Sequence, residues 1–242
     1  MLDASVIDFL SGIFDKFIEY FISILLRVPG VIIGISVHGF AQALVATIFG
    51  DKGPRHEKKL TLNPLTHADP IGFLSLLLFR FGWAAPVSIN LRDKKHPRLK
   101  RFLAIFSGPA ANLLIAFLVL FLLIPFSIRS VVAAINTLPT IFIWFFGILK
   151  TTLNSFCIVN VTLAVFNLIP LPPLDGFRLL GVFIPRHAYK NMMRYQNHFA
   201  LGFMILLLID TYFFSYIGDA LLMAASFILN DCFAGLINLI FF

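Results

Sequence analysis

Two long stretches without a charged side chain constrain the fold of this chain more than any other feature. Residues 30–50 and 102–126 contain no Asp, Glu, Lys or Arg. An α-helix rises about 1.5 Å per residue, so about 20 apolar residues span the roughly 30 Å hydrocarbon core of a bilayer. Both stretches are therefore predicted to be transmembrane helices.

The composition of the whole chain favours a protein that crosses the membrane several times. Of its 242 residues, 59% are hydrophobic, 13% are charged and 29 are phenylalanines, and the mean hydropathy is +0.92. Ordinary soluble domains carry about 25% charged residues. We therefore predict an all-α polytopic membrane protein that lies in the lipid bilayer.

The net charge of +7 has a membrane explanation rather than a nucleic-acid one. Most of the 19 basic residues lie in three short segments beside predicted spans, at 52–59, 80–101 and 178–194. Loops rich in Lys and Arg stay on the cytoplasmic side of membrane proteins. The pattern predicts an integral membrane protein whose basic loops are cytoplasmic, without a nucleic-acid partner.

The N-terminal segment differs from the spans. Residues 4–29 mix acids with phenylalanines and isoleucines, which is typical of an amphipathic interfacial helix, and partial insertion is the alternative. Pro29 and Gly30 are predicted to end this helix. The segment is predicted to be part of a single membrane domain, residues 1–242.

Residues 70–90 are apolar but irregular. Arg80, Gly82 and Pro86 interrupt them, and the pieces on either side are too short to cross a bilayer as regular helix. Irregular backbone at membrane depth needs protein or a wet cavity around it. We predict a re-entrant segment followed by a short strand.

Further crossings are expected in the second half of the chain. The region 131–169 is interpreted as one main crossing, because two crossings would place Arg178 and Arg186 outside, against the positive-inside bias. The predicted crossings are residues 145–169, 199–217 and 220–242.

The first uncharged span carries two local patterns. Gly30 and Gly34 form a small-xxx-small pair, which predicts close packing of another helix. His38 and Gln42 are four residues apart and project from the same helical face. Such a pair often only ties one membrane helix to another.

Four more stretches give the polar pair a context. They are LTLNPLTHADPIG at 60–72, FGWAAPVSIN at 81–90, SGPAANLL at 107–114 and FNLIPLPPLDGFRLL at 166–180. Together with HGFAQ at 38–42 they resemble the site-2 protease family of intramembrane zinc metalloproteases. The resemblance is to the short bacterial form without a PDZ domain. It covers roughly residues 30–200, leaves 201–242 as C-terminal spans, and implies a bacterial plasma membrane.

The resemblance also shows what is altered. In that family a span carries His-Glu-x-x-His, and a later Leu-Asp-Gly supplies the third zinc ligand. Here His38 and Asp175 remain, whereas Gly39 stands at the position of the general base and Gln42 at that of the second histidine. A neutral amide oxygen suits a harder cation better than zinc. His38, Gln42 and Asp175 are thus predicted to form a weak metal site at best, with no confident catalytic residue.

Each altered position also has a purely structural interpretation. His38 is then a neutral imidazole hydrogen-bonded to Asp175 or Gln42, which removes the cost of unpaired polar groups in the membrane. Gly39 is then a helix-packing residue. Three prolines before Asp175 predict an unwound backbone that lines a cavity.

Several other polar or aromatic residues are candidates. By the resemblance, Asn112, Asn167 and Trp83 line a substrate groove; helix-to-helix hydrogen bonding and an interfacial aromatic anchor are the alternatives. His67 is a candidate substitute ligand or a turn residue. Asp210 is an acid within a predicted span and has no assigned role.

Three functions remain open from the sequence. The favoured hypothesis is a site-2 protease homologue with a degenerate zinc site that binds or regulates a transmembrane segment of another protein. The alternative is an active intramembrane zinc metalloendopeptidase that uses His38 and Asp175 with Gln42 or His67. A transporter that uses Asp175 and Asp210 is the third.

Overall fold

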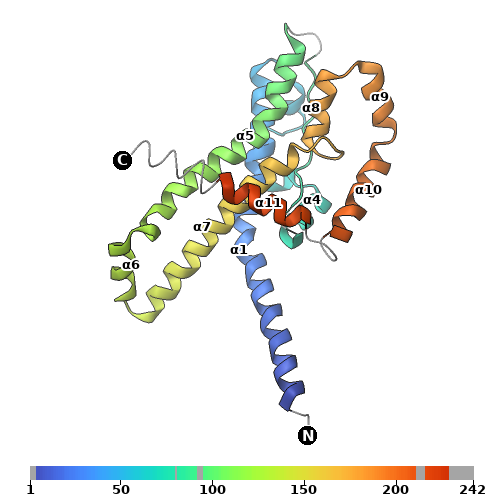
Figure 1. Ribbon diagram of the computed structural model, residues 1–242. Coiled ribbons are helices and arrows are strands. Elements are labelled where there is room, and N and C mark those ends of the chain that lie inside the picture. The colour runs from blue at the N-terminus through green and yellow to red at the C-terminus, as the bar shows by residue number, and fades with distance from the viewer. Residues whose placement is uncertain (1–3, 80, 92–94, 211–215, 229–242) are drawn as a thin grey trace.

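The protein is a bundle of helices of very unequal length (Figure 1). The computed structural model describes residues 4–79, 81–91, 95–210 and 216–228. Within these residues the α-helices are α1 Ala4–Ile48, α2 Gly53–His56, α3 Pro64–His67, α4 Pro70–Phe79, α5 Pro97–Leu123, α6 Arg129–Asn136, α7 Thr140–Asn167, α8 Asp175–Phe183, α9 Arg186–Arg194, α10 Gln196–Ile209 and α11 Tyr216–Phe227. A 3-10 turn, Ile124–Ser127, extends α5.

Three helices, α1, α5 and α7, pack against one another and form the centre of the molecule (Figure 1). Each contains a segment long and apolar enough to cross a membrane, at Ser11–Ile48, Pro97–Ser127 and Thr140–Asn167. The three segments contain or largely overlap the spans predicted at 30–50, 102–126 and 145–169. The predicted all-α polytopic fold is therefore confirmed.

The helix boundary predicted at Pro29 and Gly30 is wrong. Helix α1 has 45 residues in all and continues without a break through Pro29. Proline removes one backbone hydrogen bond, which membrane helices tolerate where neighbouring groups compensate. Two side chains tie this part of α1 to the end of α4: Tyr20 donates to the Leu78 carbonyl at 2.6 Å and Arg27 to the Leu77 carbonyl at 3.1 Å.

The small-residue face of α1 packs against α7 as predicted. A methyl group at Gly30 would lie 2.9 Å from the Cα of Phe156, and one at Gly34 would lie 2.8 Å from Oδ1 of Asn160. The absent side chains let the two backbones approach closely. This approach brings the polar groups of α7 next to the turn of α1 that precedes His38.

The irregular stretch at 70–90 forms a short helix followed by extended chain. Helix α4 has 10 residues, and a single antiparallel bridge joins Ala68 to Ala84. The predicted strand is thus reduced to one bridge within the described residues. From Pro86 to Leu91 exposed positions alternate with more buried ones, as expected for extended backbone on a protein surface.

The proline-rich segment before Asp175 is not helical, as predicted. Helix α7 ends at Asn167 and α8 begins at Asp175. The last two predicted crossings, 199–217 and 220–242, lie partly outside the described residues. Their described helices, α10 and α11, have 14 and 12 residues, which is shorter than the about 20 that a crossing needs.

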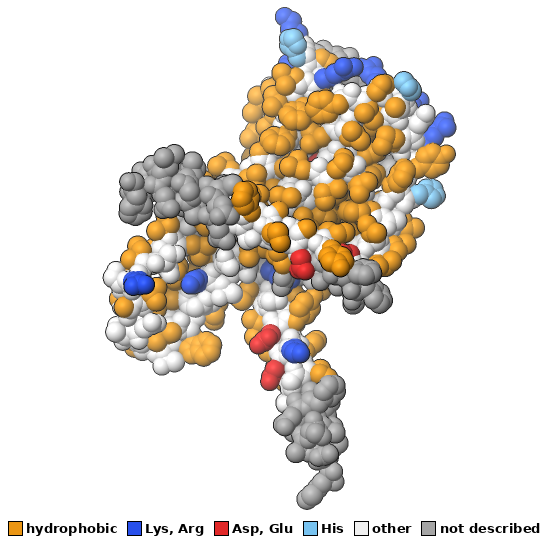
Figure 2. Space-filling view, in the orientation of Figure 1, with side chains coloured by type: hydrophobic (Ala, Val, Ile, Leu, Met, Phe, Trp, Pro, Cys, Tyr) orange, Lys and Arg blue, Asp and Glu red, His pale blue; other side chains and the backbone are white. Residues whose placement is uncertain are grey.

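Charge and apolar surface are separated along the molecule. Figure 2 shows Lys, Arg and His side chains gathered at the end where α5 begins and where α9 lies, above a broad hydrophobic surface. Many large side chains of the long helices are exposed there, which is expected of helices that face lipid.

Candidate functional site

The helices bring His38, Gln42 and Asp175 together in the interior. His38 and Gln42 lie one turn apart on α1, and Asp175 is the first residue of α8. Nε2 of His38 lies 2.7 Å from Oδ2 of Asp175, and Nε2 of Gln42 donates to the same oxygen at 2.6 Å. Their exposed fractions are 2%, 1% and 6%. His38 thus lies within hydrogen-bond distance of both Asp175 and Gln42, the two partners that the structural interpretation of the sequence allows.

Asn112 holds the other side of the His38 ring. Its Nδ2 donates to the Gly34 carbonyl at 3.0 Å and to Oδ1 of Asn160 at 2.8 Å, so its Oδ1 faces Nδ1 of His38 at 2.7 Å. Since a carboxamide oxygen only accepts, Nδ1 of His38 carries a proton. Asn112 therefore fixes the ring orientation, and its predicted place in a substrate groove stays a prediction.

Arg178 completes the cluster, and sequence reasoning missed it. Its guanidinium donates to Oδ1 of Asp175 at 2.7 Å and to Oε1 of Gln42 at 3.2 Å, and also to the Val87 carbonyl. From the sequence, Arg178 was assigned to a basic cytoplasmic segment. The spacing held a signal, because residues three apart on a helix lie on one face.

Helix α5 packs closely against the cluster at Gly108. A methyl group at Gly108 would lie 2.5 Å from Nε2 of His38 and 2.8 Å from Nε2 of Gln42. Gln42 also donates to the Ile105 carbonyl at 3.1 Å. Helix α5 therefore approaches the cluster through its backbone.

Gly39 faces His67, which lies at the end of α3. A Cβ atom at position 39 would overlap the imidazole of His67 at its Nδ1. Gly39 is thus a packing residue, but it packs against a side chain that follows a loop rather than against a long helix. The space that a side chain at position 39 would need is filled.

His67 is fully buried and uses one ring nitrogen. Its Nε2 donates to the Thr61 carbonyl at 2.8 Å, whereas Nδ1 has no hydrogen-bond partner among the described residues. Burial lowers the pKa of His67 below its usual value, and the hydrogen bond to Thr61 offsets part of that shift. An uncharged imidazole with a bare Nδ1 lone pair therefore lies against Gly39.

The residues present do not fit a catalytic zinc ion. Such sites use three nitrogen, sulfur or carboxylate ligands and one water. The cluster offers one imidazole and one carboxylate, and Arg178 places a fixed positive charge on the oxygens of Asp175 and Gln42. Within the described residues, no group of three His, Cys, Asp or Glu side chains lies close enough to hold a metal, so His67 does not complete the set.

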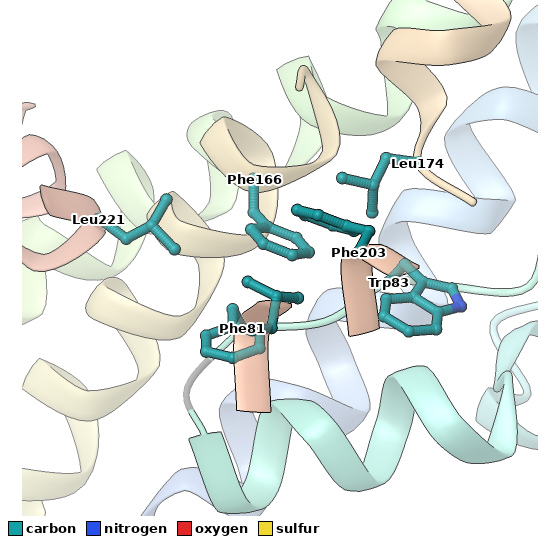
Figure 3. Close-up of a cluster of buried hydrophobic side chains, with 7 residues drawn as sticks. Phe81, Trp83, Phe166, Leu174, Phe203 and Leu221 are labelled. Atoms are coloured by element: carbon teal, nitrogen blue, oxygen red, sulfur yellow. The ribbon is translucent and has the colours of Figure 1, made fainter. Parts of the chain in front are cut away.

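The remaining candidates have other partners. Nδ2 of Asn167 donates to the Leu163 carbonyl at 2.7 Å and to the Gly82 carbonyl at 3.3 Å. Trp83 is buried among hydrophobic side chains, near Phe203 and Leu174 (Figure 3). Their predicted place in a substrate groove stays a prediction. Asp210 is buried, and its carboxylate accepts a hydrogen bond from the Ile217 backbone at 2.9 Å.

The fold and the cluster together define a class of membrane protein. Long apolar helices surround a histidine from one transmembrane segment and an aspartate that follows an unwound, proline-rich turn. This is the arrangement expected from the resemblance to site-2 proteases.

Sequence comparison identifies the family. Residues 30–209 match Peptidase family M50, and the chain belongs to this family. It is 34% identical over 197 residues to "Putative zinc metalloprotease YwhC" of Bacillus subtilis, covering 79% of this chain and 84% of that protein.

Two further relatives carry the name "Putative zinc metalloprotease Rip2". The protein of Mycolicibacterium smegmatis is 30% identical over 160 residues, 64% of this chain and 56% of that protein. The protein of Mycobacterium tuberculosis strain H37Rv is 26% identical over 184 residues, 74% of this chain and 65% of that protein. No solved structure matches the chain.

Proposed function

We propose that this protein binds a membrane-embedded segment of another protein without cleaving it. The observation that carries the proposal is the position of Arg178, whose guanidinium donates to Asp175 and Gln42. In an active relative the side chains at these two positions would have to face a metal. With Gly39 in place of a general base, the cluster has no side chain at that position to take a proton from water.

The extended segment 86–91 is the proposed binding surface. Pro86, Ser88 and Asn90 are exposed, and the segment lines a cavity. An unwound peptide can add its backbone to such an edge by β-augmentation. The basic loops beside it are proposed to lie in the cytoplasm of a bacterial plasma membrane, within one membrane domain that includes the segment 4–29.

A direct test measures metal and cleavage in the same sample. Protein purified in mild detergent is expected to hold far less than one zinc per chain and to leave a single-span substrate intact. One zinc per chain, lost together with cleavage in Asp175→Asn, would refute the proposal in favour of an active enzyme.

Binding is tested by site-specific photocrosslinking. A crosslinker at Ser88, within the extended segment, is expected to capture a co-expressed single-span segment, whereas one at Leu118, exposed on α5, serves as the control. Equal adducts from both positions would indicate lipid-like contact only. Absence of a Ser88 adduct with every segment tried would remove the binding half of the proposal.

Restoring the family's His-Glu-x-x-His motif tests whether the fold can still bind zinc once the altered side chains are replaced. Gly39→Glu with Gln42→His recreates the motif, but the imidazole of His67 occupies the space of the new side chain. The double variant is therefore compared with a triple variant that also carries His67→Ala. Zinc binding is expected in the triple variant and reduced in the double. If neither gains zinc, the proposed correspondence between this cluster and the family's metal site is wrong.

The active enzyme is the second candidate, and one observation favours it. Nδ1 of His67 is buried without a hydrogen-bond partner among the described residues and lies against Gly39. A lone pair in that place is the type of group that accepts a proton in general base catalysis. If wild-type protein cleaves a substrate, His67→Gln should abolish cleavage.

A further inference from the structure

A cavity of about 1070 Å³ lies beside the cluster, at the basic end of the molecule. Its walls are the extended segment 86–91, the start of α5, the turn at Pro172 and Pro173, and helices α8 and α9. This volume is slightly above the range of roughly 300 to 1,000 Å³ that is typical of small-molecule sites. It is distinct from the closely packed interior around His38.

The charge of the lining has one sign. Among the described residues, five cationic side chains take part and no Asp or Glu does; the cationic residues are Arg98, Arg101, Arg178, Arg186 and Lys190. Arg178 is already paired with Asp175, and Arg101 also has an interaction partner. Like charges that share a cavity repel one another, so the arrangement is favoured when an anion binds between them.

Backbone groups add to this preference. Pro97 and Arg186, the first residues of α5 and α9, both line the cavity, and no side chain in the described part of the chain caps either helix start. The beginning of a helix carries a partial positive charge and unpaired N–H groups that suit phosphate oxygens. The two helix starts therefore reinforce the cationic side chains.

Apolar side chains complete the lining. Phe177, Val182 and Met193 line the same cavity as the arginines. A ligand that fits the whole cavity carries a phosphate together with apolar groups. At the basic end of a membrane protein, an anionic phospholipid meets both conditions, because its headgroup carries the phosphate and its acyl chains are apolar.

We infer that the cavity between residues 86–91, α8 and α9 binds a phosphate ester, with Arg98, Arg186 and Lys190 as its cationic contacts. The cavity shares segment 86–91 with the proposed peptide-binding surface, but its three cationic contacts belong neither to that segment nor to the cluster around His38, so the variants below test the phosphate site separately. Arg178 connects the two regions, since its guanidinium reaches the cluster while the residue lines the cavity.

The test measures thermal stabilisation of the purified chain in a neutral detergent. Short-chain phosphatidylglycerol, short-chain phosphatidylcholine, glycerol 3-phosphate and an acidic peptide are titrated separately. Phosphatidylglycerol is expected to raise the unfolding midpoint in a saturable way, and phosphatidylcholine is not. Equal stabilisation by glycerol 3-phosphate would support the phosphate site and identify a soluble ester as the source.

Variants locate the effect. Arg186→Gln with Lys190→Gln is expected to weaken the apparent affinity at least about tenfold, and Arg98→Gln alone is a second, milder variant. The matched control removes two exposed charges outside the cavity, Arg55→Gln with Lys58→Gln, and is expected to bind like wild type. Unfolding midpoints without ligand check that each variant folds.

Three results would overturn the inference. They are equal stabilisation by the zwitterionic and anionic lipids, equal weakening in the control pair, and stabilisation by the acidic peptide alone. The first would indicate an apolar site, the second a diffuse charge effect, and the third a protein partner.

Discussion

The two sides of the His38 ring use different chemistry to bury polar groups. On the Nδ1 side, Asn112 and Asn160 form an uncharged chain that ends on backbone carbonyls of α1 and α7. On the Nε2 side, Asp175 and Arg178 bring full charges, with Gln42 between them.

The difference follows from the chain segments that build each side. The uncharged side lies between α1, α5 and α7, whose helical backbones are satisfied internally, so amides suffice to join them. The charged side depends on α8 and the irregular turn before it, next to the basic cavity. The contrast teaches that charge lies where irregular backbone and a cavity reduce the cost of burying it.

The largest effect is expected on the charged side. Asp175→Asn leaves Arg178 beside a neutral partner and is predicted to lower the free energy of unfolding by about 3 kcal/mol, because a buried ion pair is broken on one side. Thermal unfolding in detergent measures the loss. Adding Arg178→Met should recover most of it; if the double variant is as unstable as the sum of the singles, the two residues do not act as a pair.

A smaller loss is expected on the uncharged side. Asn112→Leu removes hydrogen bonds to His38, Asn160 and the Gly34 carbonyl. Leaving buried partners unsatisfied is predicted to cost about 2 kcal/mol, measured in the same assay. A loss larger than that of Asp175→Asn would reverse the ranking of the two sides.

Helix packing on the uncharged side gives the next prediction. Gly34→Ala places a methyl group 2.8 Å from Oδ1 of Asn160 and is predicted to cost about 1 to 2 kcal/mol through overpacking. Gly147→Ala on α7 is the matched control, because nothing lies within 4 Å of its added methyl group. Equal midpoints for the two variants would show that α1 and α7 pack less tightly than these distances require.

The smallest effect is expected at His67, which lies on neither side of the ring. His67→Leu removes the hydrogen bond to Thr61 and fills a similar volume, so the predicted loss is about 1 kcal/mol. A loss above that of Asn112→Leu would mean that Nδ1 of His67 has a partner in solution. Unfolding midpoints of the two variants, measured side by side, decide the point.

Sequence reasoning predicted the parts of this structure that depend on local patterns. The central spans follow from uncharged stretches of helical length, and the pairing of His38 with Asp175 follows from family motifs. Arg178 was missed because loop composition, not helix spacing, was used to place it. The contact of Gly39 with His67 joins residues 28 positions apart in the chain, and no local pattern encodes it.

The continuity of α1 was missed for a related reason. Proline is a reliable boundary in water, whereas neighbouring groups in a membrane protein can compensate for the lost hydrogen bond. The hydrogen bonds of Tyr20 and Arg27 to the end of α4 come from tertiary structure that the sequence does not reveal.

Because α1 is unbroken, its N-terminal part and the part that carries His38 form one continuous helix. The helix extends from the central bundle to the N-terminal end of the described chain, and residues 11–20 are exposed (Figure 1). At about 1.5 Å per residue, Ser11 lies roughly 40 Å along the axis from His38. Pro29 lies between the two residues and leaves the backbone ladder without one donor, so it is the position at which this long helix is expected to bend.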